Sequence, residues 1–92
     1  MRISMTYFAQ IRRAAGGDTE TLELPAGATV ADALSAAAAG HSADFRALTL
    51  APDGAPHANL IVLVNDQPAA RGRPAHLREG DRVSLFSPVA GG

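Results

Sequence analysis

Residues 25–41, PAGATVADALSAAAAGH, contain the clearest structural signal in the chain. Thr29 can cap a helix, and Asp32, three residues later, completes a capping-box pattern that also complements the helix dipole. Gly40 stands where a left-handed C-cap is expected. The stretch predicts one helix of about three turns. Its apolar residues follow the i, i+3, i+4, i+7 spacing of a narrow stripe suited to packing on a sheet, and they are Val30, Ala33, Leu34 and Ala37.

Two segments with alternating polarity precede this helix. RISMTYF, residues 2–8, has the two-residue period of a half-buried strand, and its core positions are Ile3, Met5 and Tyr7. TETLEL, residues 19–24, resumes the alternation. Between them, AAGGD at residues 14–18 supplies two glycines that permit a turn. These segments predict an antiparallel hairpin with a long loop.

The second half of the chain predicts further strands. Residues 41–59 carry a weak pattern, which we interpret mostly as loop with room for a short strand or a turn of helix. LIVLVND, residues 60–66, is a β-branched run typical of a strand buried on both faces. A polar connector follows, in which Leu77 is the large apolar anchor. DRVSLFS, residues 81–87, is the last strand, with Val83 and Leu85 facing one side and Ser84 and Phe86 the other.

The order of these elements predicts the fold class. Two hairpin-like ends joined by a helical crossover indicate an α+β domain of the ubiquitin-like β-grasp type, with one main helix on one face of a mixed sheet. We assign residues 1–86 to this domain and residues 87–92 to a flexible C-terminal tail. Phe86 then lies on the open face just before the tail, where an exposed aromatic side chain would anchor a partner unless loops cover it.

Composition excludes several classes of function. The 92 residues are 47% apolar and 18% charged, which indicates one folded domain. A net charge of −1 argues against a bulk nucleic-acid or membrane-surface binder. The absence of cysteine excludes disulfides, thiolate metal sites and a cysteine nucleophile in this sequence. No signal peptide or membrane span is evident, so a cytoplasmic location is expected. All eight basic residues are arginine, so the chain offers no side-chain amine.

Side chains that could carry catalysis form no recognisable site. His41, His57 and His76 lack metal-ligand spacing, and no nucleophile elbow or triad spacing is present. No glycine-rich phosphate loop follows a strand, so ATP would be bound by a partner rather than here. We therefore expect no bound cofactor, no metal and no enzymatic activity of the chain itself.

The tail SPVAGG, residues 87–92, is the remaining candidate for chemistry. A carboxylate is a poor electrophile, but adenylation with ATP turns it into a mixed anhydride that sulfur or nitrogen can attack. Gly91 and Gly92 have no Cβ atoms and can pass through a narrow channel, while Pro88 stiffens the exit from the strand. The six residues beyond Phe86 span at most about 20 Å. An inert, frayed tail is the alternative interpretation.

YFAQIRRAAG at residues 7–16 and LREGDRVSLFSPVAGG at residues 77–92 resemble the MoaD/ThiS sulfur-carrier family. The resemblance spans the whole chain in order. The run FAQIR at residues 8–12 is most like the small subunit of molybdopterin synthase, whereas residues 41–59 also resemble carriers that serve cysteine biosynthesis.

The resemblance implies a mechanism and a set of partners. A ubiquitin-activating-like adenylyltransferase would adenylate Gly92, and a sulfur donor would convert it to a thiocarboxylate. The large subunit of molybdopterin synthase would then use that sulfur in molybdenum cofactor biosynthesis. Gly92 would be the reactive residue, and the partner-binding residues would be Gly91, Ala90, Val89, Pro88 and Phe86. The alternatives are a carrier for cysteine or thiamine biosynthesis, and a ubiquitin-like protein modifier.

Overall fold

The computed structural model describes residues 1–69 and 75–87 of the chain. These residues form a mixed sheet of five strands in the order β2-β1-β5-β3-β4. The strands are β1 (Arg2–Tyr7), β2 (Thr19–Glu23), β3 (Ile61–Val64), β4 (Gln67–Pro68) and β5 (Arg82–Phe86). The helices are α1 (Ala9–Ala15), α2 (Val30–Ala39) and α3 (Ala43–Thr49).

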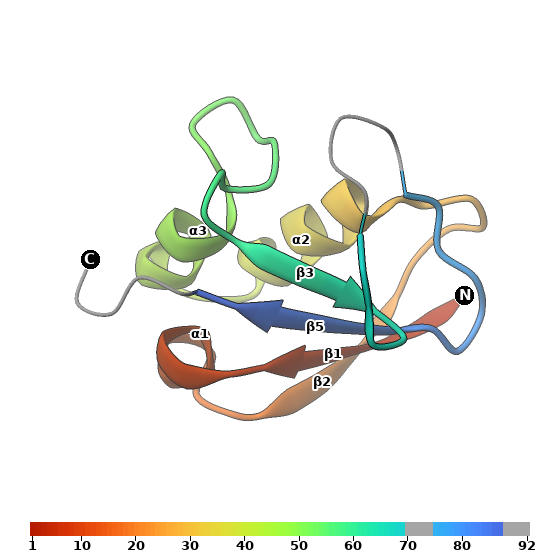
Figure 1. Cartoon of the computed structure of the whole chain (residues 1–92), viewed down its shortest axis with the longest axis horizontal. Helices are drawn as coiled ribbons and strands as arrows, with labels where there is room; N and C mark the ends of the chain where they lie inside the picture. Colours follow the sequence, from red (N-terminus) through yellow and green to blue (C-terminus); the bar gives the residue numbers. More distant parts are fainter. Residues whose placement is uncertain (70–74, 88–92) are drawn as a thin grey trace.

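The first and last strands lie side by side at the centre of the sheet (Figure 1). β1 and β5 are parallel, with Ser4 opposite Arg82 and Tyr7 opposite Leu85. β2 joins the free side of β1 and β3 joins the free side of β5, both antiparallel. The predicted α+β fold of the ubiquitin-like β-grasp type is thereby confirmed.

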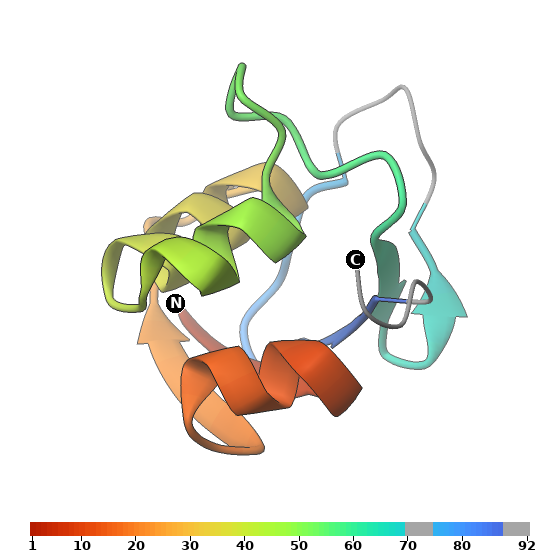
Figure 2. The same ribbon diagram turned by 90° about the vertical axis from the view of Figure 1, so that its left-hand side faces the viewer.

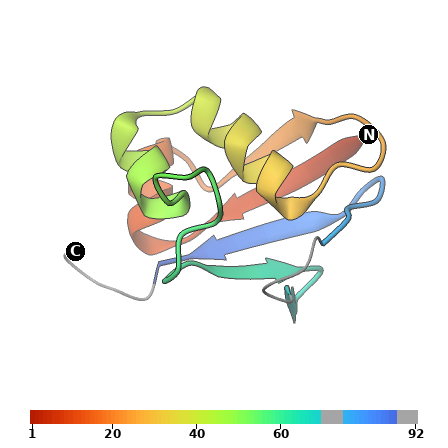
Figure 3. The ribbon, with the colours of Figure 1, turned by 90° about the horizontal axis from the view of Figure 1, so that it is seen from above.

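The core lies between one face of this sheet and the layer formed by α2 and α3, which cross above the strands (Figure 3). The predicted alternation of both central strands is confirmed, because the inward side chains of Ile3, Met5, Tyr7, Val83 and Leu85 are all buried. The predicted stripe of α2 faces them, and it is buried together with Ala38. Phe45 of α3 and Ile11 of α1 complete the core with fully buried side chains.

The ends of α2 match the sequence prediction at one terminus only. At the start, the Thr29 amide donates to Asp32 Oδ2 at 2.9 Å, and the Asp32 amide donates to Thr29 Oγ1 at 3.2 Å, so the capping box is confirmed. At the end, Gly40 has φ −98°, so the predicted left-handed C-cap is wrong. The Gly40 amide still donates to the Ala37 carbonyl at 3.1 Å without a positive φ.

Two helices occupy segments that the sequence pattern assigned to loops. The β1–β2 pair is an antiparallel hairpin as predicted, but its connection contains α1, which packs at one end of the sheet (Figure 2). Phe8 occupies the N-cap of α1 and makes no side-chain cap bond, so the usual start signal is missing. The segment 41–59 contains α3, which Ser42 caps by accepting from the Phe45 amide at 3.3 Å. Each helix has only seven residues, too few for a clear period.

β3 is less buried than predicted. Ile61 is 43% exposed, because the helices cover only one face of the sheet. Leu60, immediately before the strand, and Leu77, the anchor of the connector, are both buried. Within the described parts of the chain, no helix is long and apolar enough to cross a bilayer.

Candidate functional site

Phe86 is the last residue of β5 and lies on the face of the sheet opposite α2 and α3. Its side chain is half-buried because the ring of Phe8 stacks against it, with centroids 4.3 Å apart and planes 4° apart. Phe8 itself remains 38% exposed. The two possibilities for Phe86, an open anchor or a covered core residue, therefore resolve into a stacked pair at the surface.

Ile61 extends this pair across the next strand. It is the direct partner of Phe86 in the antiparallel register of β3 and β5, so both side chains project from the same face. Phe8 and Ile61 are the two large apolar side chains that are exposed in residues 1–69 and 75–87. We call Phe8, Ile61 and Phe86 the apolar platform. A contiguous exposed patch of this kind is typical of a protein-binding surface.

Two residues in the left-handed region of the backbone help to position the platform. Ala9 has φ 51°, so the chain bends sharply directly after Phe8 as β1 gives way to α1. Asn65 also has φ 51° and opens the tight turn after β3. Its side-chain Oδ1 accepts from the Arg82 amide at 2.9 Å, and its Nδ2 donates to Asp81 Oδ1 at 2.8 Å. These bonds hold β3 in the register that sets Ile61 opposite Phe86.

Beyond the platform, the open face carries both polar and apolar side chains. The register places Ser4, Thr6, Thr21 and Ser84 on this face, together with Leu63, which is directly opposite Ser84. Ser84 is buried, whereas Ser4 and Thr21 are exposed polar side chains that offer little apolar area to a partner. The three residues of the platform lie at the end of the sheet where β5 ends at Phe86.

The predicted site residues of the tail cannot be compared with the structure. Gly92, Gly91, Ala90, Val89 and Pro88 lie outside the described residues. Ser87 is the last described residue before them, and it directly follows Phe86. Of the predicted partner-binding residues, the structure thus places Phe86, and it adds Phe8 and Ile61, which the sequence interpretation had not selected.

A polar network that the sequence did not indicate lies on the other side of the sheet. The Tyr7 hydroxyl donates to Glu20 Oε2 at 2.5 Å, and His41 Nε2 hydrogen-bonds the same oxygen. Burial, and then the Glu20 carboxylate, raise the pKa of Tyr7 well above its usual value. The His41 ring also packs against Phe45, with centroids 4.6 Å apart. The network fixes the junction of α2 and α3 to β1 and β2, which is a structural role.

Within residues 1–69 and 75–87, no group of three histidine, aspartate or glutamate side chains is arranged to hold a metal ion. The platform offers contact area to a partner but no acid, base or nucleophile.

Comparison with known proteins identifies relatives along nearly the whole chain. The sequence model of the ThiS family matches residues 5–92. Small archaeal modifier protein 1 of Haloferax volcanii is 35% identical over 85 residues, which cover 92% of this chain and 94% of that protein. The crystal structure of the same archaeal protein matches with a TM-score of 0.86 and 32% identity over all of both chains. A putative molybdopterin converting factor, subunit 1, from Pyrococcus furiosus matches with a TM-score of 0.76 and 29% identity, covering 97% of this chain and 99% of that one.

Proposed function

This chain belongs to the ThiS family of small ubiquitin-like carriers and modifiers, and from that premise we propose that it is a sulfur carrier activated at the carboxylate of Gly92. Its sulfur would go to the large subunit of molybdopterin synthase, which builds the dithiolene of the molybdenum cofactor. The chain acts as the carrier subunit of that sulfurtransferase complex, and its partners supply the catalytic groups. The likeness to the Pyrococcus furiosus converting factor supports this acceptor.

The proposed chemistry has two stages. The Gly92 carboxylate attacks the α-phosphate of ATP, and pyrophosphate leaves, so that an acyl adenylate forms on the activating enzyme. A persulfide of the sulfur donor then attacks the acyl carbon and AMP leaves. A thiol of the donor system then attacks the donor's own sulfur in the resulting acyl disulfide. The S–S bond to the acyl sulfur breaks, a disulfide forms within the donor system, and the thiocarboxylate remains on Gly92. The chain contains no cysteine, so every thiol in this sequence of steps belongs to a partner.

The observation that carries the proposal is the position of the apolar platform. Phe86, stacked on Phe8, is one residue before Ser87, where the tail begins. An enzyme that receives the tail in its active site must bind the body of the carrier at the root of that tail. The platform provides rigid aromatic area there, and aromatic side chains are enriched among residues that dominate binding energy.

Protein modification is a second candidate function. The relative from Haloferax volcanii that is 35% identical is named as a modifier protein. Both functions begin with adenylation of Gly92 and differ in the acceptor, which is a synthase subunit for a carrier and an amine of a target protein for a modifier. The chain has no lysine, so a modifier of this sequence would have no lysine of its own to extend into a branched chain.

One reconstitution separates these candidates. The chain is incubated with ATP, the adenylyltransferase and a sulfur donor from the same organism, and its intact mass is measured. Replacement of one oxygen by one sulfur, followed by loss of that sulfur to the large synthase subunit and its pterin precursor, supports the carrier. Covalent adducts on other proteins, with no sulfur delivered to the synthase, support the modifier. Sulfur loading that neither acceptor consumes would assign the chain to another sulfur pathway.

A further inference from the structure

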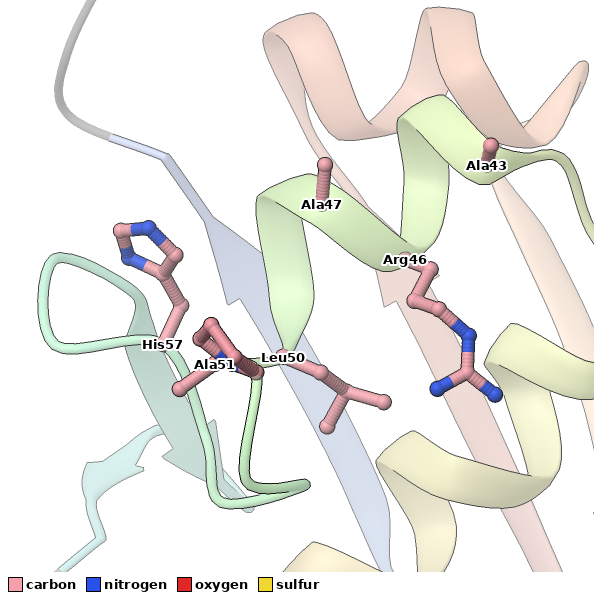
Figure 4. A pocket seen from close by; sticks show the side chains of 7 residues that line it. Ala43, Arg46, Ala47, Leu50, Ala51 and His57 are labelled. Atoms are coloured by element: carbon pink, nitrogen blue, oxygen red, sulfur yellow. The ribbon is translucent and has the colours of Figure 1, made fainter.

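A second surface lies near the same end of the molecule as the apolar platform, but on the helical side of the sheet. An open groove of about 370 Å³ runs between α3 and the loop that follows it. Its floor is apolar and includes Ala47, Leu50 and Pro52. Figure 4 shows Arg46 and His57 at opposite ends of this groove, with Leu50 and Ala51 between them. The groove therefore combines an apolar floor with a nitrogen-bearing side chain at each end.

Backbone hydrogen bonds hold the walls of this groove. The His57 amide donates to the Thr49 carbonyl at 2.9 Å, and the Ala51 amide donates to the Ala55 carbonyl at 2.7 Å. Asp53 Oδ1 accepts from the Ala55 amide at 3.0 Å, which fixes the tip of the loop. Leu50 is buried and anchors the loop to the core. A groove that is already formed costs little reorganisation when a ligand binds.

The charge of Arg46 has no ion-pair partner among the described residues. Arg2, Arg12 and Arg82 each form an ion pair with a carboxylate, but in residues 1–69 and 75–87 Arg46 forms none. Its nearest acidic neighbour in sequence, Asp44, is two positions away on α3, a spacing that places the two side chains on different sides of a helix. The guanidinium of Arg46 is exposed and can form a charge-assisted pair with a carboxylate of another molecule.

His57 adds a second donor of defined orientation. Its Nδ1 accepts a hydrogen bond from the Asn59 amide at 3.0 Å. An accepting Nδ1 carries no proton, so in the neutral ring the proton is on Nε2, which can donate to a carbonyl or carboxylate.

The backbone connects the groove directly to the platform. The loop that forms one wall leads through buried Leu60 directly into Ile61 of the platform. α3, which forms the other wall of the groove, lies near the end of β5 on the face of the sheet opposite the platform (Figure 1). A partner that grips the tail and rests on the platform would meet the groove by extending past Ile61.

We propose that this groove binds an acidic segment of the adenylyltransferase that activates Gly92. A carboxylate of that segment pairs with Arg46, an adjacent small apolar side chain covers Leu50 and Pro52, and a backbone carbonyl accepts from His57 Nε2. The inference rests on the proposed function, since both candidate functions begin with this enzyme. It adds a contact that recognises the body of the carrier by charge, separately from the tail.

The test is ATP–pyrophosphate exchange by the adenylyltransferase at varied concentrations of the carrier. Arg46→Glu is expected to raise KM for the carrier by about tenfold or more, with kcat unchanged and a smaller rise for Arg46→Gln. Added salt should raise KM of the wild-type chain more steeply than that of Arg46→Glu. Arg78→Glu is the matched control, because Arg78 is exposed and lies in the turn before β5 begins, at the opposite end of that strand from Phe86. The KM of the enzyme for the Arg78→Glu carrier should stay within about twofold of that for the wild-type carrier.

Several results would overturn the inference while leaving the proposed function intact. One is an unchanged KM for Arg46→Glu in a preparation whose thermal unfolding matches wild type. A lower KM for Arg46→Glu would instead assign the groove to the chain's own tail, and a dimer that Arg46→Glu dissociates would assign it to a second copy. Deletion of Gly92 should abolish exchange in the same assay. If that deletion leaves exchange at the wild-type rate, the proposed function itself fails.

Discussion

Phe8 and Phe86 stack in parallel at the surface, with ring centroids 4.3 Å apart, and so join the ends of the first and last strands. The contact exists because β1 and β5 are neighbours in parallel register at the centre of the sheet. A stacked aromatic pair contributes about 0.5–1.5 kcal/mol beyond the burial of its area. The stack therefore holds a rigid apolar surface at the root of the tail.

Replacement of Phe86 by alanine should impair partner binding more than folding. We expect Phe86→Ala to weaken binding to the adenylyltransferase at least about tenfold and to lower the free energy of unfolding by only about 1–2 kcal/mol. Titration calorimetry and urea denaturation measure the two effects. Val83→Ala is the control, because Val83 is fully buried on the other face of the same strand and should lose stability with little change in affinity. A large loss of stability in Phe86→Ala with normal binding would show that Phe86 is ordinary core.

Ionisation of Tyr7 should lower the free energy of unfolding at alkaline pH. Its pKa is raised in the folded state by burial and by Glu20, so the folded protein keeps the phenol proton while the unfolded chain loses it above about pH 10. The stabilisation is fully present below that pH and is lost as pH rises further toward the folded pKa, by up to about 1.4 kcal/mol per pH unit.

Tyr7→Phe tests this linkage cleanly because Tyr7 is the single tyrosine of the chain. The variant should be about 1.5–3 kcal/mol less stable at neutral pH, since it loses a hydrogen bond to a carboxylate. Above about pH 10, the difference in the free energy of unfolding should shrink. Urea denaturation at a series of pH values measures it, and parallel curves for the two proteins would contradict the prediction.

Ala9→Gly should stabilise the fold. Ala9 has φ 51°, a conformation that costs an L-residue about 1–2 kcal/mol and costs glycine nothing. The greater entropy of glycine in the unfolded chain offsets about 0.4–1 kcal/mol of this gain. We expect a net rise of about 0.5 kcal/mol in the free energy of unfolding.

The control for this substitution is Ala14→Gly in the last turn of α1, where a negative φ is required, and it should destabilise the protein by about 0.5–1 kcal/mol. Thermal unfolding of both variants measures the two changes in stability, which should have opposite signs. A loss of stability in Ala9→Gly as large as that in Ala14→Gly would mean that the backbone at residue 9 is not strained.

The sequence was sufficient to predict the elements that have long, regular patterns. The alternation of Ile3, Met5 and Tyr7 and the capping box of Thr29 and Asp32 depend on local spacing, and the structure contains both. α1 was missed because its N-cap, Phe8, provides no capping side chain, and because the bend at Ala9 uses a residue that rarely takes a positive φ. The exposure of Ile61 was missed because a β-branched run cannot reveal how many faces of a sheet are covered.

Only part of the candidate site could be predicted from the sequence, for a related reason. The parity of β5 placed Phe86 on the open face, but the neighbour that stacks on it comes from the other end of the chain. Periodicity carries no information about which strands pair, so Phe8 could not be selected. The same limit applies to Tyr7, Glu20 and His41, which the fold brings together from β1, β2 and the connection between α2 and α3.

The intact mass of the chain after reaction with ATP, the adenylyltransferase and a sulfur donor tests the central claim most directly. The wild-type chain should exchange one oxygen for one sulfur. A variant with one alanine added after Gly92 retains the platform and the groove, but it displaces the reactive carboxylate, and its mass should not change. Equal sulfur loading of the extended variant would contradict the assignment of Gly92 as the reactive residue.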